Sequence, residues 1–276
     1  MRIEKHMGSL LAQRLEASKH EQAKLLEKMA TGKKINRASD DAAGLAIAGE
    51  FEKQIRGFRN ASQNIEAGMS ALAIADGNAS SITDMLQRQR ELAMQGANGT
   101  YNADQRESLN REFHSLSDEI ARVSQGAGFN GMNLLDGTGK LADGTGKLQV
   151  GPGAGPGDQI SLPGADLTLA SLDMDEVTLD SQDASFNALS AIDSAMAKVN
   201  STRATQGGVV NRLEDALAHV QNQVVNTTKS LSAVEDLDFA KALTDKVRTE
   251  ILGSTGLASL SQFNQISRSH LLALLQ

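Results

Sequence analysis

Apolar residues recur every seven positions through the first half of the chain and predict one long helix. A strict seven-residue period keeps a single apolar seam facing a partner along the whole helix. Ser39-Asp40-Asp41 is a typical helix start, and the glycines at 96 and 99 indicate a helix end. We expect a helix from Ala42 to Gln95, roughly 80 Å long at about 1.5 Å per residue. The seam comprises Phe51, Phe58, Ile65, Leu72, Ala79, Leu86 and Ala93.

A second long seam lies in the last third of the chain. Before it, apolar spacings of four and three predict a shorter helix through Leu109, Phe113, Leu116, Ile120 and Val123. Two long seams of nearly equal length, separated by a compact insert, are expected to pack antiparallel. The second seam has one row at Leu189, Met196, Arg203, Val210, Leu217, Val224 and Leu231, and another at Ile192, Val199, Gln206, Leu213, Val220, Thr227 and Val234.

The middle of the chain, residues 126–183, is rich in glycine, aspartate and threonine. Residues 148–150 and 159–162 alternate in polarity around the Gly/Pro turn 151–157, which predicts a β-hairpin. Residues 167–169 and 177–179 are weaker strand candidates, and a six-residue segment at 136–141 recurs at 143–148. The predicted fold class is mainly α: a long antiparallel helical rod with coiled-coil terminal helices and a small β-hairpin region in the middle.

Both ends of the chain carry leucine-rich helical stripes. An apolar stripe at a chain end is exposed unless it finds a partner. The pattern leaves two interpretations open: the ends fold back on the same molecule, or they await other copies of the chain. The residues are Leu10, Leu11, Leu15, Leu25 and Leu26 near the start, and Leu257, Leu260, Phe263, Ile266, Leu271, Leu272 and Leu275 near the end.

Composition narrows the function. The formal net charge is -7, which does not favour sequence-independent binding of nucleic acid. Cysteine is absent, so disulfides, thiolate catalysis and cysteine-based zinc sites are excluded. No apolar run predicts membrane insertion, and the start lacks the apolar core of a cleaved signal peptide. Composition alone therefore indicates a cytosolic protein, unless an exporter reads a signal that is not cleaved.

The sequence offers no residues for catalysis or for a cofactor. The five histidines are scattered without metal-site spacing, so we expect no metal. Lys147 follows a glycine as in a phosphate loop, but Leu141 occupies the place of the first glycine and Leu148 that of the Ser or Thr. An enzyme with a metal-dependent insert would need a histidine in residues 126–183, which contain none. We therefore expect no enzymatic activity.

Residues 26–47, from Leu26-Glu27-Lys28-Met29 to Asp41-Ala42-Ala43-Gly44-Leu45-Ala46-Ile47, strongly resemble the N-terminal signature of bacterial flagellin. The resemblance continues through residues 63–70, 87–98 and 129–135, and in the second half through 191–195, 207–212 and 262–265. It leaves only residues 163–183 for the large, variable outer domain of many flagellins. The chain thus resembles a minimal flagellin.

The resemblance implies two domains. Residues 1–35 and 239–276 would form a terminal-helix domain that pairs into an inner tube, and residues 36–238 a helical outer-core domain with the β-rich segment 126–183. The terminal leucines would then be polymerisation residues, which gives the exposed stripes their missing partner. The expected function is a structural subunit that polymerises into the flagellar filament for motility. The alternative within the family is a hook–filament junction protein, and outside the family a soluble helical binding module.

The resemblance also implies partners and a location. The partners are other copies of the chain, other flagellins, an export chaperone at the C-terminal helix, and hook-junction and cap proteins. Type III export without a cleaved signal would place the protein outside the cell, in the filament, with a periplasmic or sheathed filament left open. Arg88, Leu92 and Glu112 match a flagellin surface that contacts neighbouring subunits and, in some flagellins, an innate receptor of vertebrates.

Overall fold

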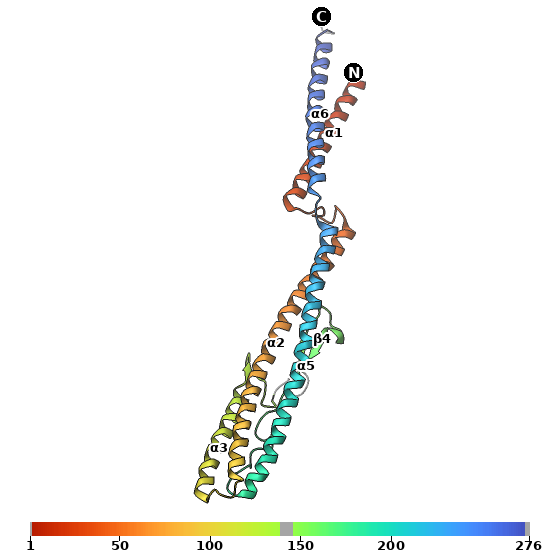
Figure 1. The fold of residues 1–276 in the computed structure, drawn as a ribbon. Helices are drawn as coiled ribbons and strands as arrows, with labels where there is room; N and C mark the ends of the chain where they lie inside the picture. The colour runs from red at the N-terminus through yellow and green to blue at the C-terminus, as the bar shows by residue number, and fades with distance from the viewer. Residues whose placement is uncertain (1, 139–145, 274–276) are drawn as a thin grey trace. The chain divides into compact units, whose positions relative to one another are not determined.

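The computed structural model describes the backbone of residues 2–138 and 146–273, and the side chains of residues 8–138 and 146–266. The described part is mainly α-helical, as predicted (Figure 1). Its α-helices are α1 (Arg2–Thr31), α2 (Ala42–Gly96), α3 (Ala103–Gly126), α5 (Gln182–Glu235) and α6 (Phe239–Ala273). The strands are β1 (Gly128–Phe129), β2 (Met132–Asn133), β3 (Lys147–Gln149) and β4 (Gln159–Ser161), and η1 (Pro156–Asp158) is a 3-10 turn.

Contacts between residues divide the chain into two compact units. Residues Met1–Lys53 and Asn226–Gln276 form the terminal unit, and Gln54–Val225 form the bundle unit. The predicted domain boundaries, at 35/36 and 238/239, fall instead where the helices themselves are interrupted, between α1 and α2 and between α5 and α6.

In the bundle unit, α2, α3 and α5 run side by side, with α5 antiparallel to α2 (Figure 1). Two apolar clusters hold them together, one around Phe113, Leu86 and Ile192, the other around Ile65 and Leu213. The β3–β4 hairpin packs on the second cluster through its own buried Val150 and Ile160. The buried sides of α2 and α5 carry residues of the seven-residue rows, among them Ile65 and Leu86 on α2 and Ile192 and Leu213 on α5.

The residues of the predicted rod seam differ in how deeply they are buried. Ile65, Leu72 and Leu86 are buried, whereas Phe51 and Phe58 are half-buried. On α5 the more buried row is the one that contains Ile192, Val199, Leu213 and Val220. The other row is half-buried along its flank: Leu189, Val210, Leu217, Val224 and Leu231.

One prediction about the middle of the chain was wrong, and one element there was not predicted. Residues 167–169 and 177–179 form turns and irregular backbone instead of strands. The N–H of Leu167 donates to Leu135 O (2.8 Å) beside an isolated antiparallel bridge between Asp136 and Asp166, and the N–H of Leu179 donates to Asn110 Oδ1 (2.9 Å). Conversely, the β1–β2 hairpin was not predicted, although Asn130 and Gly131 both have positive φ, 50° and 75°. Half of each copy of the recurring six-residue segment, residues 139–141 and 143–145, lies outside the described residues.

Candidate interaction surface of the terminal helices

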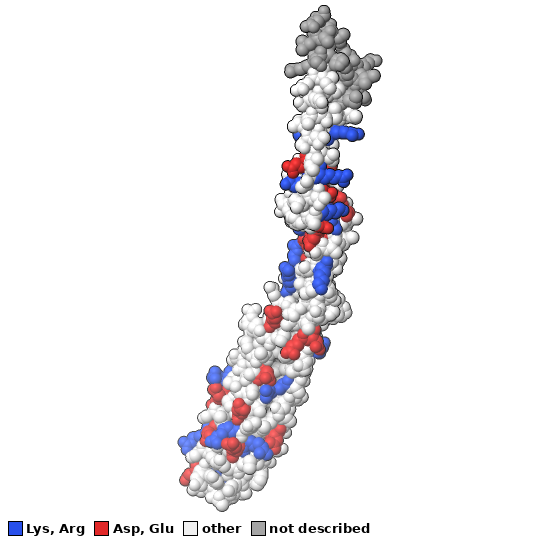
Figure 2. Space-filling view, turned by 45° about the horizontal axis from the view of Figure 1, so that its top comes forward, with Lys and Arg blue, Asp and Glu red and all other residues white. Residues whose placement is uncertain are grey.

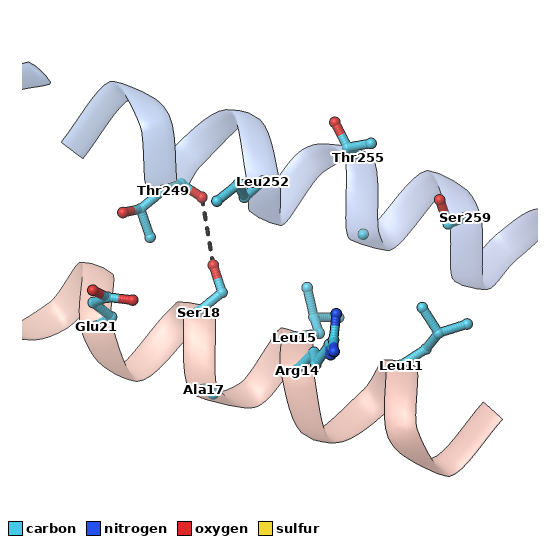
Figure 3. Close-up of a pocket in the computed structure, with 11 residues that line it drawn as sticks. Leu11, Arg14, Leu15, Ala17, Ser18, Glu21, Thr249, Leu252, Thr255 and Ser259 are labelled. Atoms are coloured by element: carbon cyan, nitrogen blue, oxygen red, sulfur yellow. Dashed lines mark hydrogen bonds between the residues drawn. The ribbon is translucent and has the colours of Figure 1, made fainter. Parts of the chain in front are cut away.

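The two terminal helices pair antiparallel in one continuous register. Gly8 lies opposite Phe263, Leu15 opposite Gly256, and Ser18 opposite Gly253. The hydroxyl of Ser18 also donates to the carbonyl oxygen of Thr249 at 3.4 Å (Figure 3). This pairing answers one question that the sequence left open, because the chain ends do contact each other within one molecule.

The α6 face that meets α1 is built mainly from small or polar residues. Ala242 and Thr249 are buried there, and Gly253 and Gly256 are half-buried. On α1, Leu11, Leu15 and Leu25 are half-buried, as are Leu260 and Phe263 on α6. Because much of this face carries little apolar surface, pairing with α1 covers only part of the aliphatic side chains of α6.

The larger aliphatic side chains of α6 remain exposed. Leu252, for example, keeps 60% of its surface exposed, and Leu10 and Leu26 on α1 each keep 47%. Side chains beyond residue 266, including Leu271, Leu272 and Leu275, lie outside the described residues. We call these exposed side chains the aliphatic face; soluble monomers rarely leave an apolar surface of this extent uncovered. Its described α6 members, which lie around the whole side of the helix that does not face α1, are the aromatic Phe239 and the aliphatic Leu243, Val247, Ile251, Leu252, Leu257 and Ile266.

A groove of about 460 Å³ opens between α1 and α6 beside this face. Figure 3 shows its lining, with Leu11 and Leu15 directed from α1 toward α6, and Arg14 and Glu21 along the same stretch of α1. Its remaining polar lining on α6 consists of hydroxyls, such as Thr255 and Ser259. The groove thus combines leucine side chains with hydroxyls and with the charged Arg14 and Glu21.

The second predicted surface is only partly at the surface. Arg88 donates to Glu112 Oε1 from Nε (3.0 Å) and from Nη2 (2.7 Å), and from Nη1 to Glu91 (2.9 Å). Hydrogen bonding to Glu112 raises the pKa of the Arg88 guanidinium. Leu92, however, is 1% exposed and belongs to the bundle core, since it faces the α2 side that packs on α3 and α5. The prediction that Leu92 lies on this surface was therefore wrong, whereas Arg88 and Glu112 are exposed.

Charged side chains of both signs alternate over the face shown in Figure 2. Ion pairs join the long helices of the bundle unit: Arg90 Nε lies 2.8 Å from Asp193 Oδ1, and Arg203 Nε lies 2.8 Å from Asp76 Oδ1. Hydrogen bonding to Asp76 raises the pKa of Arg203. The ion pair with Asp76 explains how Arg203, a charged residue in an otherwise apolar row, is accommodated in the seam of α5.

Among residues 8–138 and 146–266, whose side chains the structure describes, histidines and carboxylates nowhere gather in threes that could hold a metal ion. None of the helices in residues 2–138 and 146–273 combines the length and the apolarity that crossing a bilayer requires. The fold and the surface thus define a mainly helical protein whose paired chain ends expose an aliphatic face.

Comparisons with known proteins identify the family. The model of the bacterial flagellin N-terminal helical region matches residues 5–140, and that of the C-terminal helical region matches residues 189–275. The chain is 35% identical over 280 residues to the flagellar filament 33 kDa core protein of Treponema phagedenis, covering 98% of both chains. It is 34% identical over 242 residues to a flagellin of Halalkalibacterium halodurans, covering 88% of both. The chain belongs to the bacterial flagellin family.

Solved structures show the same fold. A crystal structure of Bacillus cereus flagellin has a TM-score of 0.50 at 32% identity, covering 61% of this chain and 94% of that one. A putative flagellar hook-associated protein from Vibrio parahaemolyticus has a TM-score of 0.58 at 18% identity, covering 71% of this chain and 100% of that one. At that identity the likeness to the Vibrio protein shows the fold alone.

Proposed function

We propose that this chain is a structural subunit that polymerises into a bacterial flagellar filament. The family and the names of the relatives, which are called filament core proteins, support this function. The observation that carries it is the aliphatic face of α6, which pairing with α1 leaves exposed. Polymerisation would bury this face between copies of the chain, with no covalent step.

The free energy of polymerisation would come from many small contributions of buried apolar side chains. Completing the burial of one half-exposed leucine contributes on the order of 1 kcal/mol. One such side chain cannot offset the entropy lost when a helix is ordered, but a row of them along a helix can. Growth without an end requires that one surface of a subunit meets a different surface of the next. In the proposal, the α6 face and the groove beside it are two such surfaces.

The proposed polymerisation residues follow from this arrangement. They are the leucines and other apolar residues predicted from the sequence, of which Leu10, Leu26, Leu257 and Ile266 are exposed in the single chain. Leu11, Leu15, Leu25, Leu260 and Phe263 are half-buried between the two helices. The former group would contact other copies, and the latter would hold α1 on α6.

The test is a charge placed on the exposed face. Leu257→Asp should abolish filament growth, because it would bury an unpaired carboxylate between subunits. Leu257→Met is the matched control, since it keeps an apolar side chain of similar volume. Seeded polymerisation followed by sedimentation and negative-stain microscopy measures the yield. Filaments of wild-type yield from Leu257→Asp would contradict the proposal.

The finer parts of the function are proposals of the same kind. An export chaperone would cover the aliphatic face of α6 before assembly, and secretion through a type III apparatus would deliver the chain to the flagellum. Other flagellins, hook-junction proteins and a cap protein are the further proposed partners. The inner-tube domain would comprise residues 1–35 and 239–276, and the outer core residues 36–238. We propose no catalytic role, and we propose Arg88 and Glu112 as part of a contact between subunits.

A further inference from the structure

The C-terminal end of α5 lacks the basic side chains that normally suit a helix end. Its last turn contains no Lys, Arg or His, yet it ends on Glu235, whose side chain is only 8% exposed. A carboxylate at this position meets the negative end of the helix dipole and has lost most of its contact with water. Glu235 therefore depends on a positive charge from elsewhere in the chain.

That charge comes from the segment between α1 and α2. Lys33 Nζ lies 2.5 Å from Glu235 Oε1 and 3.8 Å from Glu52 Oε1 on α2. Lys34 Nζ donates to the carbonyl oxygen of Ala233 at 3.0 Å, one of the last carbonyls of α5. The hydrogen bond to Glu235 raises the pKa of Lys33. Two consecutive lysines thus supply to α5 the cationic cap that its own sequence lacks.

Backbone hydrogen bonds join the same two segments. The N–H of Lys34 donates to Glu235 O at 2.7 Å, and the N–H of Leu237 donates to Gly32 O at 2.9 Å. Together they make an antiparallel bridge between Lys33 and Asp236. Gly32 permits this path because its φ is +71°, a conformation that other residues rarely adopt. The connector 32–41 and the connector 236–238 therefore hold each other in place.

A third set of contacts fixes the first connector on α2. Ile35 is buried, and a Cβ on Gly44 would lie 2.6 Å from its Cδ1, so the glycine leaves the space that Ile35 fills. Asp41 Oδ1 accepts from the N–H of Gly44 at 2.9 Å, which caps the start of α2. Lys33 and Lys34 are consequently presented to α5 from a connector that is itself anchored.

We propose that Lys33, Lys34 and Glu235 form a clamp that caps α5 and couples the ordering of the two connectors, and through them of α1 and α6. Opening one connector would leave the Glu235 carboxylate without its cation and two carbonyls of α5 without donors. The last turn of α5 and the start of α6 would then open together with the connector 32–41. The clamp goes beyond the contacts between copies, because all of its contacts lie within one chain.

Amide hydrogen exchange of the full-length chain, in seeded filaments and in the soluble state, tests the clamp. Lys33→Met should raise exchange by about tenfold or more in both 32–38 and 232–238, since it leaves a carboxylate buried without a partner. Lys53→Met is the matched control, because Lys53 makes an exposed pair with Glu50 in the same unit. That control should change exchange in the two segments by less than about twofold.

A double variant separates the clamp from simple loss of packing. Adding Glu235→Gln to Lys33→Met removes the stranded charge, so exchange should return most of the way to the wild-type rate. Exchange in Lys33→Met that matches the Lys53→Met control would overturn the clamp. A double variant that exchanges faster than Lys33→Met would overturn it too. Changes confined to 32–38, with 232–238 unaffected, would contradict the coupling.

Discussion

Single glycines in α2 show how the packing of the bundle unit is specified residue by residue. A Cβ on Gly57 would lie 2.6 Å from Pro152 Cβ and 3.2 Å from Pro152 Cα, in the turn of the β3–β4 hairpin. A Cβ on Gly77 would meet nothing within 4 Å. Both glycines cost helix stability relative to alanine, but only Gly57 admits a close neighbour.

The first prediction follows from that pair. Gly77→Ala should stabilise the protein by about 0.5–1 kcal/mol through helix propensity alone. Gly57→Ala gains the same propensity but displaces the proline ring, so it should destabilise by about 1 kcal/mol or more. Urea unfolding followed by circular dichroism measures both. A Gly57→Ala variant as stable as Gly77→Ala would show that the hairpin turn does not need the glycine.

Asp40 supports a prediction about pH. Its side chain accepts from the N–H groups of Asn36 and Arg37, each at 3.2 Å. The bond from Asn36, followed by that from Arg37, lowers the pKa of Asp40 from its ordinary value of 3.8. Because the folded pKa is depressed, the stabilisation is present above 3.8 and is lost as the pH falls through the folded pKa.

The advantage of the wild type over Asp40→Asn should therefore shrink as the solution is acidified below the ordinary pKa of the carboxyl group. Thermal unfolding of both proteins across an acid series measures the difference, and an NMR titration gives the pKa of Asp40 directly. A difference that grows toward acid would reverse the sign and refute the interpretation.

At the scale of elements, periodic patterns were sufficient for the long helices and insufficient for the middle segment. The helix predicted as Ala42 to Gln95 is Ala42–Gly96 in the structure, because a repeated apolar seam and a glycine stop act locally. Leu167 and Leu179 have the same apolar character, but their backbone N–H groups are bonded by Leu135 and Asn110. Those partners are distant in sequence, so no local pattern could have identified them.

The candidate surface at the chain ends was likewise predicted only in part. The terminal leucines were identified from the sequence because helical spacing reveals an apolar stripe. Which of them lie between α1 and α6 depends on the register of the two helices, and Leu257 and Leu15 differ in exposure for that reason. Leu92 was placed on a surface by resemblance alone, whereas its buried position follows from how α3 packs on α2.

Asn110 gives a prediction for the segment that joins the hairpin to α5. Its Oδ1 accepts from the N–H of Leu179 at 2.9 Å, and its Nδ2 donates to Asp180 Oδ1 at 2.7 Å. Asn110→Ala should destabilise the bundle unit by about 1–2 kcal/mol, because the backbone N–H of the buried Leu179 loses its acceptor. Limited proteolysis should then cut near residues 175–181 faster than in the wild type.

Asn110→Asp provides the control for that anchor. It keeps the acceptor for Leu179 but sets a second carboxylate against Asp180. Stability should then recover at acid pH, where the two groups share protons, and it should not recover for Asn110→Ala. Equal behaviour of the two variants at all pH values would mean that neither hydrogen bond anchors the segment.

At the scale of the whole molecule, the packing that stabilises the chain and the surface proposed for assembly belong to different units. Every residue of the two apolar clusters lies within Gln54–Val225, whereas the exposed aliphatic face of α6 lies in the terminal unit. Loss of the chain ends should therefore leave the bundle intact. The alternative is a chain whose ends contribute to a common core, and for that chain trimming would cause unfolding.

Removing residues 1–41 and 236–276 tests this division. The remaining chain keeps α2, α3, α5 and both clusters, so its helices should unfold cooperatively and near the temperature of the bundle in the full-length protein. It should stay monomeric by light scattering and add nothing to filament seeds, because the α6 face is gone. Extension of seeds by the trimmed chain would move the assembly surface into the bundle unit. Loss of cooperative unfolding would instead show that the terminal unit stabilises the bundle, since no residue of either cluster has been removed.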